Sequence, residues 1–313
     1  MSTAPRVSPV SPPPFAPLPR PHDAAGRERR VGVEVEFTGL SERRAAGVLA
    51  GLLGGRVEEE DPFAFHLVGS ALGRISVERD LRHIHPNRPH RHPAPWLRPP
   101  FSAWAGASVG LIVPRELVTE PLTPDRFPAV DAALAALRHA GAGGNGATLA
   151  GSLGLHLNIV PPDPAPETIL ALLRAYLVLE EELRGAILRS PLERLHAPEP
   201  FPASYRRLVL DPAYGRDLQG LSDDYLVANP TRKRGLDLLP LFLELLGDRV
   251  AGRIIDKVKP RPVFHYRLPV ARLGQPGWSL AEDWNRWVEV ERIAANKEAL
   301  AAAAARALVG LRR

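Results

Sequence analysis

The sequence predicts an α+β fold in which a largely antiparallel sheet is flanked by helices. Residues 30–37 and 154–160 alternate apolar and polar side chains, which is the periodicity of a strand, and residues 263–268 are strand-like. Helical stretches lie between these runs without the regular alternation of parallel βαβ folds, and no internal repeat is present. These observations favour one sheet with mainly antiparallel neighbours.

The first half of the chain contains clear boundary signals. Residues 1–28 are proline-rich and poor in large apolar side chains, so we expect a disordered or extended tail, with a single domain over residues 29–313. Ser41 is expected to cap a helix that ends at Gly54 and Gly55. A hairpin over residues 63–78 should follow, and a further helix over residues 124–139.

The second half is predicted to be mainly helical. A long amphipathic helix is expected over residues 163–189, followed by a loop-rich stretch to residue 229. Residues 236–246 are predicted to form a helix despite Pro240, and Ser279 should begin a single C-terminal helix.

Composition excludes several classes of site. The chain has 313 residues, 45% of them hydrophobic, which is enough for one large core. It has no cysteine, so disulfides, zinc–thiolate sites and a cysteine nucleophile are excluded. Any metal site must use carboxylates and imidazoles, which favours hard ions such as Mg²⁺ or Mn²⁺.

Charge and hydropathy indicate which kinds of partner and which cellular location to expect. The 40 basic and 35 acidic residues give a net charge of +5, with arginines in local clusters. Because acidic residues are nearly as numerous, a site for phosphates or carboxylates is favoured over nucleic acid. No apolar run reaches the roughly 20 residues of a membrane span, and no signal peptide is evident, so we expect no membrane association and a cytoplasmic location.

The first strand carries the strongest chemical signal. Glu34 and Glu36 are two residues apart in a predicted strand, so both carboxylates project from the same side. Two like charges about 6–7 Å apart are unfavourable unless a cation lies between them, which suggests divalent ions bridging phosphate oxygens. The alternative is a solvated strand face.

Further acidic and polar residues recur on later strands. Glu78 and Glu116 are candidate metal ligands, although each is equally compatible with an ordinary surface position. His156 and Asn158 share one strand face and could bind a metal or a nucleotide, although a histidine in an apolar strand is often structural.

Basic residues in two later segments could bind anions. Arg232 and Arg234 precede a predicted helix, and Arg261 precedes a strand whose one face carries His265 and Arg267. Arginine forks match phosphates and carboxylates and could stabilise charge on a transferring phosphoryl group. A solvated basic turn and a surface strand are the alternatives.

A loop insertion rich in His, Pro and Arg is predicted over residues 83–100. Its histidines, His83, His85, His90 and His92, do not match a zinc-binding template, so we expect no functional metal site there.

The order of six segments over residues 30–290 resembles the amidoligase family, which is related to glutamine synthetase and glutamate–cysteine ligase. The segments are GVEVEF, VERD, ELVTEP, GLHLN, NPTRKRGLDLLPLF and RPVFHYRLP. The resemblance implies a catalytic domain with a curved antiparallel sheet like that of glutamine synthetase, which binds ATP and two or three Mg²⁺ ions.

The resemblance also implies roles for individual residues. The metal ligands would be Glu34, Glu36, Glu78, Glu116 and His156, and His156 and Asn158 would also contact the cofactor. Arg261, which precedes the last strand, is predicted from its position to be a further cofactor-binding residue. The catalytic residues that bind phosphate or carboxylate would be Arg232, Arg234 and Arg267. One position departs from the family pattern: His265 stands where the better-known relatives have a metal-binding glutamate, so it is either a softer metal ligand or the mark of a lost site.

The predicted function is an ATP-dependent carboxylate–amine ligase that forms an amide or isopeptide bond through an acyl-phosphate. Its substrates would be a carboxylate and an amine, each a small molecule or a peptide. Two alternatives remain open at this point: a non-catalytic descendant that binds an anionic ligand, and a metal-dependent hydrolase. The sequence decides neither the substrates nor the oligomeric state.

Overall fold

The structure is a computed structural model, and it describes residues 12–79, 114–148 and 151–311. Its strands are β1 (Val31–Phe37), β2 (Arg56–Asp61), β3 (Ala64–Ser70), β4 (Gly73–Arg79), β5 (Arg115–Thr119), β6 (Ala147–Thr148), β7 (Gly151–Ser152), β8 (Leu155–Ile159), β9 (Leu236–Asp237) and β10 (Phe264–Tyr266). Its helices are α1 (Glu42–Leu53), the 3₁₀ helix η2 (Pro124–Arg126), α3 (Phe127–His139), α4 (Pro166–Ile187), α5 (Pro191–His196), α6 (Ala203–Leu210), α7 (Leu218–Ala228), α8 (Leu239–Leu246), α9 (Asp248–Ala251), α10 (Ala281–Ala295) and α11 (Lys297–Gly310).

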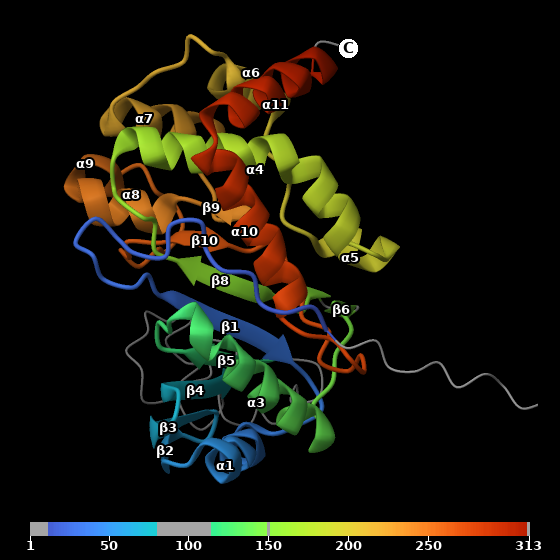
Figure 1. Ribbon diagram of the computed structural model, residues 1–313. Helices are drawn as coiled ribbons and strands as arrows, with labels where there is room; N and C mark the ends of the chain where they lie inside the picture. The colour runs from blue at the N-terminus through green and yellow to red at the C-terminus, as the bar shows by residue number, and fades with distance from the viewer. Residues whose placement is uncertain (1–11, 80–113, 149–150, 312–313) are drawn as a thin grey trace, which may run out of the picture.

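Eight strands form one open sheet, in the order β2-β3-β4-β5-β1-β8-β10-β9 (Figure 1). Every pairing within it is antiparallel. Strands β6 and β7 form a separate two-stranded sheet. The predicted α+β fold with an antiparallel sheet is therefore confirmed.

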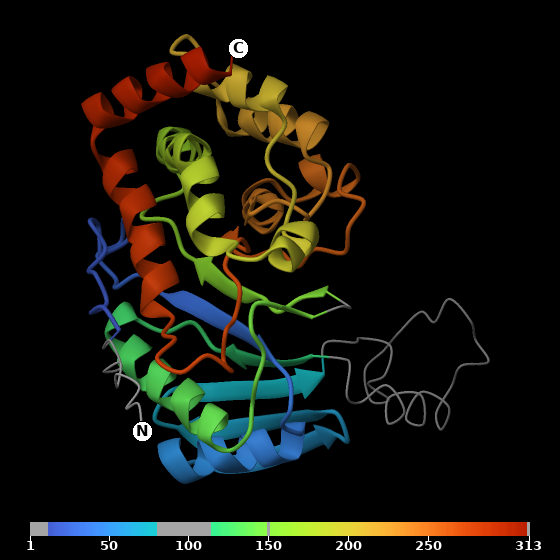
Figure 2. The same cartoon turned by 90° about the vertical axis from the view of Figure 1, so that its right-hand side faces the viewer.

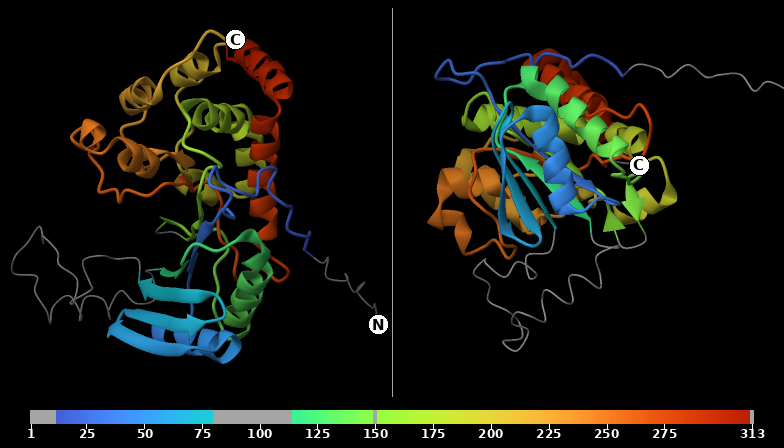
Figure 3. Two further views of the ribbon diagram at one scale, coloured as in Figure 1. Left: turned by 60° about the vertical axis from the view of Figure 1, so that its left-hand side comes forward. Right: turned by 90° about the horizontal axis from the view of Figure 1, so that it is seen from below.

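The helices form two groups at the two ends of the sheet. Helices α1 and α3 pack together, and α1 contacts β3 and β4 at one end (Figure 2). At the other end α4 packs against both α10 and α11, as two further views show (Figure 3). An edge-to-face contact between Phe127 and Trp284, with ring centroids 4.9 Å apart, connects α3 with α10. One core thus runs along the sheet, and it contains fully buried side chains of β1 and β8.

The predicted first helix and the hairpin that follows it are confirmed. Ser41 caps α1 by accepting a hydrogen bond from the backbone N–H of Arg44, and Gly54 ends the helix. The hairpin β3–β4 turns through Gly69 and Gly73, both with positive φ. Glycine adopts this conformation without the steric penalty of a Cβ atom, so both glycines fit the turn.

Residues 14–28 of the tail predicted to be disordered or extended contact the rest of the protein. Leu18 is buried, and the Ala16 N–H donates to Asn285 while the Trp284 indole donates to the Ala16 carbonyl, both at 2.8 Å. These contacts satisfy the backbone N–H and C=O of Ala16 and hold this part of the segment against α10. Residues 1–11, and the predicted insertion at residues 83–100, lie outside the described residues.

Two expectations for the second half are corrected. The stretch predicted as loop contains α5, α6 and α7. Helix α5 is capped by a Ser190–Glu193 capping box, and α6 and α7 are held by buried aromatic contacts such as Phe201–Tyr205 and Tyr205–Tyr225. The single C-terminal helix is two helices, because Asn296 adopts an extended conformation and caps α11. The long helix is confirmed as α4, whereas the predicted helix 236–246 begins only at Leu239, after the short strand β9.

Candidate functional site

Strand β1 is the centre of the candidate site. Val33, Val35 and Phe37 are fully buried in the core, so the alternating Glu34 and Glu36 project from the opposite face of the strand. Directly opposed residues of antiparallel strands point to the same side of the sheet. The pairing of β1 with its two neighbours therefore determines which side chains meet the two carboxylates.

Glu34 is brought together with two histidines from β8 and β10. Its Oε2 lies 3.2 Å from Nδ1 of His156, which is its register partner, and 3.7 Å from Nε2 of His265. The two imidazole rings meet edge to face, with centroids 5.3 Å apart. One ligand atom from each of the three residues lies within 4.8 Å of the others. We call Glu34, His156 and His265 the mixed cluster, because it combines nitrogen and oxygen donors.

The second oxygen of Glu34 contacts the two predicted cofactor-binding neighbours. Asn158 donates from Nδ2 to Glu34 Oε1 at 2.8 Å, and Arg261 Nη1 lies 3.6 Å from the same oxygen. Asn158 is also the register partner of His265 on β10. The predicted residues of β1, β8 and β10 thus converge on one carboxylate.

His265 has further partners behind it. Its Nδ1 lies 3.5 Å from Asp237 Oδ2 and 3.4 Å from Arg232 Nη2, and Arg232 Nε is itself 3.4 Å from the same Asp237 oxygen. Asp237 is fully buried and pairs with His265 across β9 and β10. The sequence interpretation did not select Asp237; its signal was a lone acid within the apolar run LDLLPLF.

Gly154 explains the local sequence around His156. A Cβ atom at this position would lie only 2.4 Å from His156 Nε2, so the imidazole occupies space that a glycine leaves open. The Gly154 N–H also donates to Glu36 Oε2 at 2.9 Å. The Gly-x-His spacing therefore places the ring of His156 against the backbone and beside β1 at once.

The other predicted acids form a second group on the same face. Glu36 pairs in register with Glu116 on β5, and Glu116 pairs with Glu78 on β4. We call these three residues the acidic row. Each is engaged in at least one interaction within the protein, so an incoming cation would join or replace an existing partner. Directly opposed like charges are unfavourable, and a cation near the row would relieve that repulsion.

Arg267 lies within electrostatic reach of both groups. Burial and nearby Arg232 lower the pKa of its guanidinium, whereas Asp237, Glu34 and Glu36 act in the opposite direction. Its Nε is buried without a hydrogen-bond partner. An arginine held between two carboxylate groups, with a donor still to be satisfied, is suited to an anionic ligand.

The protonation states of the mixed cluster suit a cation. Burial alone would raise the pKa of the Glu34 carboxyl, but the adjacent imidazoles of His156 and His265 lower it well below its ordinary value. Burial lowers the pKa of His156 to about 4, and the charge of Arg267 acts in the same direction. At neutral pH the group therefore offers a carboxylate and a neutral imidazole, the forms that bind metals.

Several buried polar atoms around Glu34 have no hydrogen-bond partner. They are His265 Nε2, Asn158 Oδ1 and Arg261 Nε, in addition to Arg267 Nε. Buried polar groups are nearly always satisfied, so such a concentration at one place indicates a ligand. The donor set fits a divalent cation at the mixed cluster and a phosphate or carboxylate beside the arginines.

Comparison with known proteins agrees with this geometry. A model of the family described as putative amidoligase enzyme matches residues 27–289, which include every residue of the mixed cluster and the acidic row. The chain belongs to this family. No curated protein and no solved structure shows significant similarity to it. Membership of the amidoligase family supports a ligase-type function.

Not every predicted residue of this amidoligase-family chain reaches the site. Arg234 is buried, donates to Asn229, Glu199 and the Pro200 carbonyl, and lies over the ring of Phe201. These contacts occupy its guanidinium among the helices behind β9. The structure brings Arg232, Arg261 and Arg267 to the site, but not Arg234.

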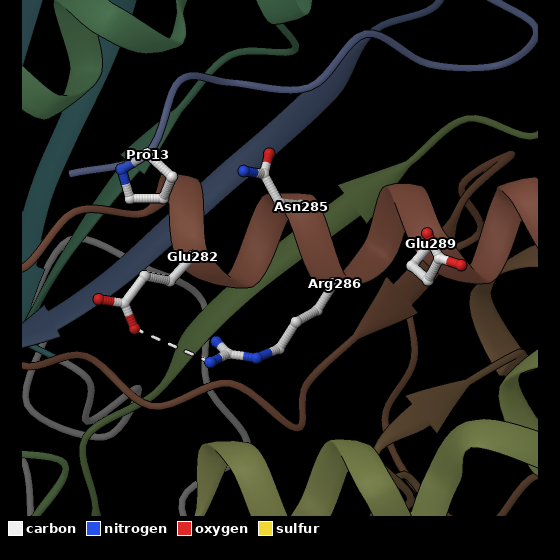
Figure 4. Close-up of a pocket in the computed structure, with 5 residues that line it drawn as sticks. All are labelled: Pro13, Glu282, Asn285, Arg286 and Glu289. Carbon is white, nitrogen blue, oxygen red and sulfur yellow. Dashed lines mark ion pairs between the residues drawn. The ribbon is translucent and has the colours of Figure 1, made fainter.

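A surface hollow elsewhere on the molecule is unrelated to the polar face of the sheet. It lies along α10 and is lined by Pro13, Glu282, Asn285, Arg286 and Glu289 (Figure 4). The ion pair between Arg286 and Glu282 crosses it at 3.8 Å.

In the part of the chain that the structure describes, no helix has the length and apolar character needed to cross a membrane.

Proposed function

We propose that this protein is an ATP- and Mg²⁺-dependent carboxylate–amine ligase that forms an amide or isopeptide bond through an acyl-phosphate. The supporting observation is the convergence on one sheet face of carboxylates, imidazoles and arginines from β1, β8 and β10. Carboxylates would hold Mg²⁺ with ATP, and arginines would bind the phosphate and the substrate carboxylate. Amidoligase membership supplies the class of reaction.

The proposed reaction has two steps. In the first, a substrate carboxylate oxygen attacks the γ-phosphorus of ATP; the new P–O bond replaces the bond to ADP, which leaves. In the second, an amine attacks the acyl carbon, the C–O bond to phosphate breaks, and inorganic phosphate leaves as the amide forms. The proton lost by the amine passes to phosphate or to solvent, and no side chain is assigned as its base.

The protein's part in this reaction is positioning and neutralisation of charge. Glu36, Glu78 and Glu116 would hold Mg²⁺, which would spread the negative charge of the transferring phosphoryl group. Arg267 and Arg261 would orient the phosphate and the substrate carboxylate in line. No nucleophilic side chain is required, which agrees with a site built from acids, imidazoles and arginines.

A second candidate function is a metal-dependent hydrolase. The observation that favours it is the mixed cluster, since two histidines and one glutamate also form the ligand set of hydrolytic zinc sites. In that case the amidoligase fold would be retained while the metal activated water. A non-catalytic descendant that only binds an anionic ligand is the third alternative.

One assay separates the three functions. The purified chain would be incubated with ATP, Mg²⁺ and a panel of amino acids, peptides and cell-wall fragments, with hydroxylamine as a general amine. ADP release together with hydroxamate formation would support the ligase. Cleavage of amide or peptide substrates without ATP would support the hydrolase instead, and ATP binding without turnover would support the non-catalytic descendant.

A further inference from the structure

The ligand atoms of the mixed cluster differ in kind from those of an ordinary magnesium site. Two of the three residues contribute imidazole nitrogen, and Glu34 supplies the only carboxylate. His265 is 1% exposed, and its Nε2 faces Glu34 without a hydrogen-bond partner. A buried ring nitrogen without a hydrogen-bond partner, close to a carboxylate and a second imidazole, indicates that the site binds an ion or molecule from outside the protein.

The donor atoms of the mixed cluster lie near the separations found around a small ion, all within 4.8 Å of one another. Zinc lies about 2.0–2.2 Å from nitrogen and oxygen ligands, so two ligands of one ion are roughly 3.0–3.6 Å apart in octahedral or tetrahedral geometry. The Glu34 oxygen lies 3.2 Å from His156 Nδ1 and 3.7 Å from His265 Nε2. An ion could therefore contact all three residues after small side-chain movements.

The chemistry of the donors selects the class of ion. Mg²⁺ prefers an octahedron of oxygens and keeps several waters, whereas imidazole suits Zn²⁺, Fe²⁺, Co²⁺ and similar ions. Affinity of a site with nitrogen donors rises along the first transition series toward copper and zinc. The acidic row offers oxygen only, so the two groups on this face differ in the ions that they favour.

The residues behind His265 support a built metal site. Metal-binding histidines commonly direct their second ring nitrogen toward a carboxylate, which fixes the ring. Asp237, fully buried, lies 3.5 Å from His265 Nδ1. Arg232 contacts the same carboxylate and holds it in place.

We propose that the mixed cluster binds one divalent transition ion, such as Zn²⁺, Fe²⁺ or Co²⁺, in preference to Mg²⁺ and separately from the Mg²⁺ that accompanies ATP. The inference rests on the proposed function in one respect: the position of this ion beside the phosphates of bound ATP. Its test uses no ATP, so its failure and that of the ligase proposal are distinguishable.

The test is a titration of the metal-free full chain, without an affinity tag, with Co²⁺. Visible absorption of bound Co²⁺ reports nitrogen ligation, and competition with Zn²⁺ and Mg²⁺ measures preference. His83, His85, His90 and His92 could also bind Co²⁺. The titration is therefore repeated in a background variant with all four replaced by asparagine.

We expect one tight Co²⁺ equivalent that survives in the background variant, is displaced by Zn²⁺, and resists Mg²⁺ at a concentration about 100-fold higher. H156N and H265N should each remove it. The matched control is H66N, because His66 is another buried histidine that contacts a carboxylate, Glu60 at 2.8 Å, on the same sheet without belonging to the cluster. H66N should bind Co²⁺ as the wild type does.

A reciprocal variant tests selectivity. His265→Glu replaces a nitrogen donor by oxygen, so we expect weaker Co²⁺ binding and at least about tenfold better competition by Mg²⁺. Circular dichroism confirms that each variant is folded; should H265E not fold, the asparagine variants still decide the question. Two results would overturn the proposal. One is loss of the Co²⁺ signal when only the four histidines at positions 83, 85, 90 and 92 are replaced. The other is competition by Mg²⁺ as effective as that by Zn²⁺ in the wild type.

Discussion

The mixed cluster and the acidic row lie on the same sheet face but differ in what surrounds them. Glu34 meets imidazoles of β8 and β10. Glu36, two residues further along β1, is instead opposed by Glu116 of β5, which is in turn opposed by Glu78 of β4. The difference follows from register, since Glu34 is opposed by His156 of β8 and Glu36 by Glu116 of β5. Under the two proposals above, these two residues of one strand would serve two different cations.

The largest effect is expected at Glu34. Glu34→Gln removes the only carboxylate of the mixed cluster and the ion-pair partner of Arg261, which would orient the phosphate. Ligase turnover should therefore fall about 10³-fold and Co²⁺ binding should be lost, with the fold intact. Hydroxamate formation and the Co²⁺ titration measure both. Glu59→Gln is the matched control, because Glu59, on the edge strand β2, forms an exposed ion pair with Arg43 of α1. Wild-type turnover in Glu34→Gln would remove Glu34 from the mechanism.

A smaller effect is expected in the acidic row. Glu36→Gln leaves two carboxylates in the row, so turnover should fall about 10²-fold with a raised KM for Mg²⁺–ATP. Co²⁺ affinity at the mixed cluster should stay within about twofold of the wild type, because Glu36 is not among its ligands. If Co²⁺ binding were lost as well, the two groups would form one site, and the comparison would fail.

Gly154 tests the mixed cluster through the position of one ring. In Gly154→Ala the new Cβ would lie 2.4 Å from His156 Nε2, so the imidazole must move. We expect Co²⁺ affinity to fall roughly 30-fold, within the range seen when the orientation of a metal ligand is disturbed. Gly151→Ala is the control, because no atom lies within 4 Å of its new Cβ. Equal affinities in the two variants would show that the ring is not a ligand.

The sequence predicted the parts of the site that depend on local alternation. The period of two placed Glu34 with Glu36 and His156 with Asn158 on common faces, and the structure agrees. It could not show which strands are neighbours, so the separation into mixed cluster and acidic row emerged only from the register. Alternation is a local property, whereas register depends on the whole sheet.

The misses have a different physical origin. Asp237 lies in a strand of only two residues, too short for any periodicity to show. Arg234 resembled Arg232 in a basic run, but its guanidinium turns into the helical side and meets Asn229 and the Pro200 carbonyl. Helices α5 to α7 were missed because they are short. In α6 and α7, stabilisation comes from aromatic packing between the two helices and Phe201 rather than from a long amphipathic pattern.

Arg267 interacts electrostatically with one glutamate of each group, so its substitution tests whether the two groups act on one ligand. Arg267→Lys keeps the charge but loses the planar fork, and we expect kcat/KM to fall roughly tenfold, or about 1.4 kcal/mol in the transition state. Since Arg267 lies near both Glu34 and Glu36, the loss should appear mainly in kcat, with Co²⁺ affinity unchanged. Arg253→Lys, at an exposed ion pair with Asp223, is the matched control and should retain wild-type kinetics. A change confined to KM would mean that Arg267 binds substrate equally in the ground and transition states, and an unchanged kcat/KM would place it outside the site.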